Sequence, residues 1–341
     1  MKANKDMIPT IHRLITSMNG ENYWFNGCAA YVMECLGEKD FDYSFFALLT
    51  GDNFTQFYKQ PCGIGGLSEC KHLFGDTKFA STIFKKCGYD SEFVSIGEMS
   101  ENKDAYIEKM AGYISKGIPV IYLGDFGDNE YKIGVIVGYA DDGEMLLCIT
   151  GDEDEPKRIA CDTLLTGKTP AISGWIFVGE KKESKSTADI CREAIYALPG
   201  IMTDKHKNFY IGAEAFRMWA DDVQNGYFEK ISAERFDFWA MYANFICVLA
   251  TNAHCAPGML RQVQVLNPDM TFIEEIAKLY ERQNEILTCD NGADLEAIGA
   301  NFNVTLETLQ NKDKQTKIAS KLIECAEISE RVAEIIQNAK R

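Results

Sequence analysis

A cysteine at the start of an expected helix is the residue best placed for nucleophilic chemistry in this sequence. Cys28 follows an aromatic stretch and the turn-forming pair Asn26-Gly27, and the residues after it, AAYVMECLG, favour a helix whose first turn carries the thiol. The dipole and free N–H groups of a helix N-terminus stabilise a thiolate, the nucleophilic form of cysteine. The alternative is that Cys28 only packs beneath the start of the helix.

Two further features are spaced around Cys28 as they are in a known group of thiol enzymes. Asn22 stands six residues before Cys28, and far along the chain YKIGVIVGY is an expected strand that ends in Val-Gly-Tyr before an acidic turn. This combination resembles the papain-like fold of the bacteriocin-leader peptidases. The continuation CLGEKDFDYSFFALLTGDNFTQFY is similar to the butirosin biosynthesis protein H N-terminal domain family. YIGAEAFRMWADDV is similar to a helix that follows that domain in many two-domain relatives.

The resemblance implies thiol-based acyl transfer or amide hydrolysis and gives roles to particular residues. Cys28 would be the nucleophile, Asn22 the amide that stabilises the oxyanion, and Asp152 the orienting group. In the family the histidine base stands seven residues before the tyrosine of Val-Gly-Tyr, and this chain has Lys132 there. A lysine with its ordinary pKa of ~10.4 is a poor proton shuttle near neutral pH. We therefore expect a degenerate catalytic site, with a small acyl, peptide or amine ligand bound in the Cys28 cleft.

The alternative is an active acyltransferase or hydrolase that uses Cys28 with a different base. His12 is the histidine whose segment could fold back near the Cys28 loop. If the site is degenerate, iodoacetamide should label Cys28 faster than the other cysteines because Lys132 favours the thiolate, and Lys132→His should bring thioesterase activity. If the enzyme is active, it should turn over thioesters and Cys28→Ala should abolish that turnover.

Other potential sites have weaker support. Cys62, Cys70 and His72 suggest zinc, but they lack a clear fourth ligand and zinc-finger spacing. The glycine-rich CGIGG has no Lys-Ser/Thr ending and no strand before it, so it does not predict a phosphate-binding loop. His206 is expected in an exposed loop and His254 at a packed helix end. We expect neither a metal nor a cofactor.

The chain changes its sequence pattern at KKESKST, near residue 181. Before it, runs such as GIPVIYLGD and SGWIFVGE favour strands, and helices are expected at about 28 to 37, 44 to 58, 77 to 87 and 103 to 116. After it, apolar residues recur at helical spacing, and Ser186 or Thr187 can cap the first helix. The prediction is a papain-like α+β domain over residues 1 to 180, followed by an all-helical domain over residues 186 to 341.

The composition of the chain limits the kinds of partner that it can bind. The net charge of −16 over 341 residues argues against nucleic acid and anionic membranes, which require a cationic surface. It suits a small-molecule or peptide ligand, in particular a cationic one such as a polyamine or aminoglycoside. The twelve cysteines occur singly without a CxxC pair, and no signal-peptide pattern is present, so we expect reduced thiols and a cytoplasmic protein.

Overall fold

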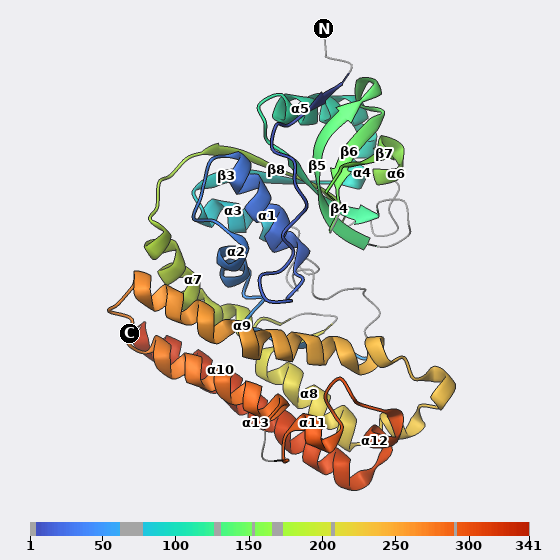
Figure 1. Ribbon diagram of the computed structural model, residues 1–341, viewed down its shortest axis with the longest axis vertical. Helices are drawn as coiled ribbons and strands as arrows, with labels where there is room; N and C mark the ends of the chain where they lie inside the picture. The colour runs from blue at the N-terminus through green and yellow to red at the C-terminus, as the bar shows by residue number, and fades with distance from the viewer. Residues whose placement is uncertain are drawn as a thin grey trace. The chain divides into compact units, whose positions relative to one another are not determined.

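The structure is a computed structural model that describes residues 5–61, 78–125, 131–151, 154–165, 173–205, 209–289 and 292–340. The chain divides into two compact units. The first comprises Met1–Thr50 and Leu67–Ile190, and the second comprises Gly51–Gly66 and Cys191–Arg341. The first unit carries a large sheet with helices, and the second is mainly helical (Figure 1).

An antiparallel sheet forms the centre of the first unit. Its strand order is β3-β8-β4-β5-β6-β7, and β1 pairs with β5 in addition. The strands are β1 (Asp6–Met7), β3 (Tyr89–Ser95), β4 (Val120–Asp125), β5 (Tyr131–Ala140), β6 (Met145–Ile149), β7 (Lys157–Ala160) and β8 (Gly174–Lys181). β4 is almost wholly buried, and so are the first five residues of β8, as their continuous apolar runs require. The prediction of a mixed α and β protein with an antiparallel sheet and a C-terminal helical region is confirmed.

Helices cover both faces of this sheet. They are α1 (Trp24–Cys35), α2 (Tyr43–Thr50), α3 (Lys78–Lys86), α4 (Ile96–Glu101), α5 (Lys103–Ile114) and α6 (Cys161–Leu164). A short 3₁₀ turn, Asp141–Gly143, joins β5 to β6. Figure 1 shows α1 on one side of β4 and β5, and α4 and α6 on the other side. α1 contacts β4 and β5, and α6 contacts β4 and β7.

The helix predicted over residues 44 to 58 is too long. α2 ends at Thr50 because Gly51 adopts a left-handed conformation with φ of +73°, which favours glycine and stops a helix. The chain then continues as an extended segment, and Phe57–Tyr58 form β2. β2 pairs antiparallel with β9 (Tyr210–Ile211) in the second unit.

The second unit is built from long helices. They are α7 (Thr187–Met202), α8 (Gly212–Gln224), α9 (Asn244–Leu266), α10 (Ile273–Leu287), α11 (Leu295–Ile298), α12 (Leu306–Gln310) and α13 (Lys312–Ala339). Short 3₁₀ turns at Phe228–Lys230 and Ala233–Arg235 and a π-helix at Trp239–Ala243 connect α8 to α9. The predicted cap before α7 is confirmed, because the Ser186 Oγ accepts a hydrogen bond from the Asp189 N–H at 3.1 Å.

The segment that follows α2 is anchored inside the second unit. The Tyr280 hydroxyl donates to the Phe54 carbonyl at 2.9 Å. The Gln56 side chain donates to the Phe245 carbonyl at 3.1 Å, and the Tyr58 hydroxyl donates to Asp222 at 2.9 Å. The segment that follows α2 thus belongs to the helical unit, although it is close to Cys28 in sequence. A single boundary near residue 181 does not describe this division of the chain.

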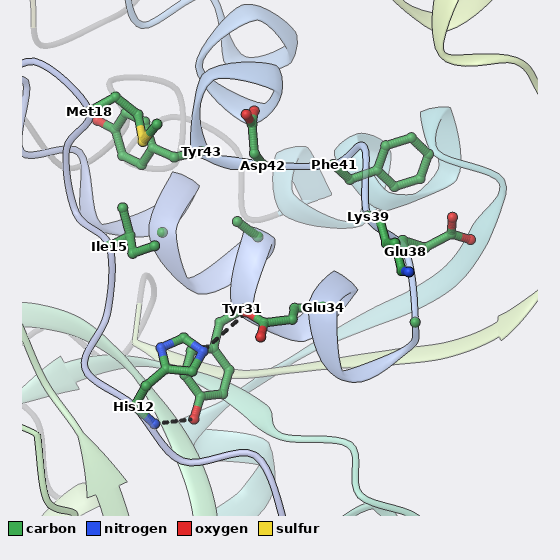
Figure 2. A pocket seen from close by; sticks show the side chains of 13 residues that line it. His12, Ile15, Met18, Tyr31, Glu34, Glu38, Lys39, Phe41, Asp42 and Tyr43 are labelled. Atoms are coloured by element: carbon green, nitrogen blue, oxygen red, sulfur yellow. Dashed lines mark hydrogen bonds and ion pairs between the residues drawn. The ribbon is translucent and has the colours of Figure 1, made fainter.

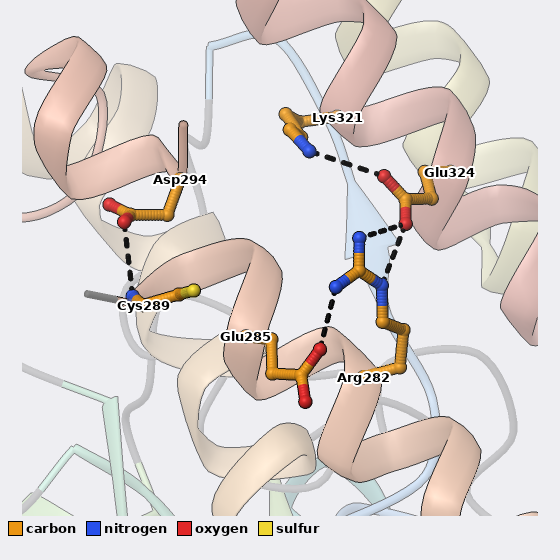
Figure 3. A network of polar contacts seen from close by, with 6 residues as sticks. All are labelled: Arg282, Glu285, Cys289, Asp294, Lys321 and Glu324. Atoms are coloured by element: carbon orange, nitrogen blue, oxygen red, sulfur yellow. Dashed lines mark hydrogen bonds and ion pairs between the residues drawn. The ribbon is translucent and has the colours of Figure 1, made fainter. Parts of the chain in front are cut away.

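A network of charged side chains joins α10 to α13 (Figure 3). Arg282 contacts Glu285 at 2.6 Å and Glu324 at 2.7 Å, and Lys321 contacts Glu324 at 3.4 Å. All four side chains are partly exposed, so each pair contributes at most about 1 kcal/mol. The network fixes the register of two packed helices, and we assign it no chemistry.

Candidate functional site

Cys28 lies deeper in α1 than the sequence predicts. The helix begins at Trp24 with Tyr23 as its extended N-cap residue, so Asn26 and Gly27 are helical instead of forming a turn. The Tyr23 N–H donates to the Tyr43 hydroxyl at 3.0 Å, which anchors the start of the helix. Cys28 therefore follows the first turn and its unpaired N–H groups, and it is 0% exposed.

Asn22 stands outside the helix in a left-handed conformation with φ of +58°. Its side-chain oxygen accepts a hydrogen bond from the indole nitrogen of Trp24 at 3.1 Å. Asn22 is exposed while Cys28 is fully buried. The structure therefore does not present the amide and the thiol at one accessible surface.

Lys132 lies on β5, and the register of the sheet determines which way it faces. It is paired with Gly124 on β4, so it shares a sheet face with Tyr122, two residues before Gly124. The Tyr122 hydroxyl contacts the Leu164 carbonyl of α6 at 3.3 Å. The Leu164 carbonyl is therefore reached from the sheet face on which Lys132 lies.

The remaining predicted site residues lie outside the described residues. Asp152 is among them, as are Cys62, Cys70 and His72 of the zinc alternative, and His206. Within the ranges that the structure describes, no group of three or more His, Cys, Asp and Glu side chains could hold a metal ion.

His12 lies against α1, and both of its ring nitrogens have partners. Nε2 is 3.0 Å from the Glu34 carboxylate, and Nδ1 is 2.7 Å from the carbonyl of Arg13. The imidazole also packs on the Tyr31 ring, with centroids 4.4 Å apart (Figure 2). His12 is therefore positioned by Glu34, Tyr31 and the backbone of its own segment.

Burial perturbs two groups beside His12. The Tyr31 hydroxyl donates to the Thr10 carbonyl at 2.8 Å, and burial raises its pKa well above the usual value. Burial, and then the neighbouring Glu34 charge, raise the pKa of Cys35 to about 11. Neither group is ionised near neutral pH, so this cysteine is no nucleophile there.

A pocket of about 460 Å³ opens beside α1 (Figure 2). The helix contributes Gly27, Ala30, Tyr31 and Glu34, and Asp42 is among the residues of the following loop that line it. The opposite wall comes from the N-terminal segment and includes His12 and the exposed apolar side chains of Ile15 and Met18. The pocket combines aromatic and apolar surface with carboxylates, which suits a ligand with an amine and an apolar body.

Sequence reasoning missed this pocket although a signal was present. Gly27, Ala30, Tyr31 and Glu34 follow the i, i+3, i+4, i+7 spacing of one helix face. Two small residues, a tyrosine and a glutamate on one face leave room for a ligand and supply polar contacts.

Comparison of the chain with protein-family models gives no match, and comparison with curated proteins gives none either. The papain-like resemblance therefore depends on the sequence motifs alone. Across the described part of the chain, no helix has both the length and the apolar character needed to cross a membrane.

Proposed function

We propose that the protein is a ligand-binding protein whose first unit has a papain-like fold and no longer catalyses acyl transfer. The observation that carries this proposal is the burial of Cys28, which is 0% exposed and lies beyond the first turn of α1. An attacking sulfur must approach a carbonyl carbon to within about 3.5 Å. A thiol without solvent access cannot do so while the helix stays packed.

The candidates for a catalytic base support the same conclusion. Acyl transfer requires a group that accepts a proton and returns it to the leaving group near neutral pH. Both ring nitrogens of His12 already contact other groups, the Glu34 carboxylate and the Arg13 carbonyl. Glu34 lies six residues along α1 from Cys28, so this contact holds His12 about 9 Å along the helix from the thiol.

The ligand site in this proposal is the pocket beside α1. Its volume of about 460 Å³ is in the range of small-molecule sites, which is ~300–1,000 Å³. Gly27 lines it, and Cys28 itself is not among its lining residues. Three carboxylates, those of Glu34, Glu38 and Asp42, line the pocket against one lysine, Lys39. This excess of negative charge favours a ligand that carries an amine.

Two measurements test the proposal. Purified protein should hydrolyse generic thioesters and amides no faster than the Cys28→Ala variant does. Spermidine, a polyamine probe, should raise the melting temperature of the wild-type protein. Glu34→Gln should weaken this effect, whereas Glu101→Gln on α4 changes the charge equally but leaves the pocket lining intact and should not.

The alternative is an active cysteine acyltransferase or hydrolase. Thioester turnover that Cys28→Ala abolishes would overturn the binding proposal, and variants of His12 would then identify the base. We also propose a cytoplasmic location, because the twelve singly spaced cysteines favour a reducing compartment.

A further inference from the structure

A second pocket lies beside β3 and β8 of the first unit. Its volume is about 670 Å³. Leu36, Ile118 and Val178 give it an apolar surface, and Tyr89 and Tyr113 add hydroxyl groups. Its volume is in the range of small-molecule sites, which is ~300–1,000 Å³.

Glu38 lines both pockets, so the two pockets meet at this side chain. The Tyr89 hydroxyl donates to the Glu38 carboxylate at 2.6 Å, and Lys181 forms an ion pair with it. Hydrogen bonds from Lys181 and Tyr89 lower the pKa of Glu38, which keeps it ionised near neutral pH. A fixed, charged side chain thus marks the border between the pockets.

The two pockets differ in the charges that remain available to a ligand. The first pocket is lined by three carboxylates, those of Glu34, Glu38 and Asp42, against one lysine, Lys39. Asp42 uses only one of its oxygens, to accept the Phe45 N–H at 2.9 Å. In the second pocket, Lys116 is exposed and has no carboxylate at ion-pair distance among the described residues. Glu180 also lines this pocket, but its side chain is 86% exposed and pairs with Lys182 at 3.2 Å. The first pocket therefore favours a cation and the second favours an anion.

We propose that one extended zwitterionic ligand spans both pockets. Its ammonium group lies beside Glu34 and Asp42, its apolar body follows Leu36 and Ile118, and its carboxylate lies beside Lys116. A short peptide with free termini and an ω-amino acid share this chemistry. The inference rests on the proposed binding function and names the ligand class for it.

The first experiment measures binding of matched linear probes by isothermal titration calorimetry. Alternating Ala-Leu peptides of two to five residues are used with free termini, as C-terminal amides and as N-acetyl derivatives, beside ω-amino acids of the same lengths. Affinity should be highest for one length, and both amidation and acetylation should lower it about three- to tenfold, as the loss of one exposed ionic contact implies. Preference for peptides over ω-amino acids of that length identifies the source of the ligand.

The second experiment assigns each end of the ligand to its pocket. Lys116→Met should lower affinity for the free-acid peptide about three- to tenfold and leave the amide unaffected. Glu34→Gln should lower affinity for both forms equally. Lys317→Met on α13 is the matched control, because this exposed lysine lines neither pocket, and it should change neither affinity.

The outcomes separate this inference from the proposed function. If amidation and Lys116→Met have no effect while Glu34→Gln still weakens binding, the bridging ligand is wrong and the binding function stands. If neither spermidine nor any peptide binds, the proposed function is wrong as well. Equal affinity at every probe length also overturns the bridging arrangement.

Discussion

Replacing Gly27 by alanine tests how closely the N-terminal segment is held against α1. A Cβ at position 27 would lie 2.3 Å from the Ile15 carbonyl oxygen and 3.4 Å from the Thr16 Cα. Both are backbone atoms, which cannot rotate away as the end of a side chain can. The variant must therefore shift the segment that carries the opposite wall of the first pocket.

Two opposing effects determine how much Gly27→Ala changes the free energy of unfolding. Alanine is favoured over glycine in a helix by about 1 kcal/mol. Overpacking of a well-packed site costs about 1–3 kcal/mol, and a backbone contact this short belongs at the upper end. We expect Gly27→Ala to destabilise the first unit by about 2 kcal/mol in total.

Gly112→Ala is the matched control. Gly112 lies inside α5, and a Cβ there would meet nothing within 4 Å, so only the helix preference acts. This variant should have a free energy of unfolding about 1 kcal/mol higher than the wild-type protein. The free energies of unfolding of the two variants should therefore differ by about 3 kcal/mol. At about 2–4 °C per kcal/mol for a unit of this size, the melting temperatures should differ by about 6–12 °C.

Thermal and urea unfolding of both variants measures the difference, and spermidine binding to Gly27→Ala should fall in parallel. If Gly27→Ala is as stable as Gly112→Ala, the segment does not pack on α1 as described. The N-terminal segment would then not line the first pocket, and the proposed ligand site would be wrong.

Three further variants or conditions test other parts of the structure. Tyr280→Phe should lower the free energy of unfolding of the helical unit by about 1–2 kcal/mol in urea, because the buried Phe54 carbonyl loses its hydrogen-bond donor. The control Tyr210→Phe changes a residue that is 39% exposed, so it should alter this free energy by less than about 0.5 kcal/mol. Alkylation of Cys35, followed by mass spectrometry, should be slow at pH 8 and rise about tenfold per pH unit towards its pKa of about 11. The folded state holds this proton more tightly than the unfolded state, so the contribution of Cys35 to stability should fall as pH rises from 9.0 to about 11. Lys132→His should give no thioesterase activity, because Cys28 would still be 0% exposed.

Local patterns in the sequence predict much of the fold. The apolar runs between Gly, Asp and Asn residues mark the strands of the sheet. The position of Ser186 before α7 predicts an N-cap, and its Oγ accepts a hydrogen bond from the Asp189 N–H. The segment after Gly51 is different, because FTQFY continues the apolar pattern of α2 and looks helical. Its bonds to Phe245 and Tyr280, far away in the sequence, determine its extended form.

The candidate site was harder to predict because side-chain direction depends on register and on helix phase. Lys132 was assigned by its distance from Val-Gly-Tyr, and a shift of one residue in a strand reverses the face on which a side chain lies. Asn26-Gly27 usually forms a turn, which predicts Cys28 in the first turn of the helix. Here Asn26 is instead buried in α1, where its side-chain oxygen accepts a hydrogen bond from Thr50 at 3.3 Å.

The phase of α1 also explains how ligand binding and thiol chemistry can be separated in this protein. Successive residues of a helix point about 100° apart, so Gly27 can line the pocket while the next residue, Cys28, points into the core. The pocket face continues through Tyr31 to Glu34, which carries the charge expected to bind an amine. A ligand can therefore lie along α1 without reaching the sulfur. For that reason Cys28→Ala should leave amine binding unchanged, whereas Gly27→Ala, one residue earlier, should weaken it.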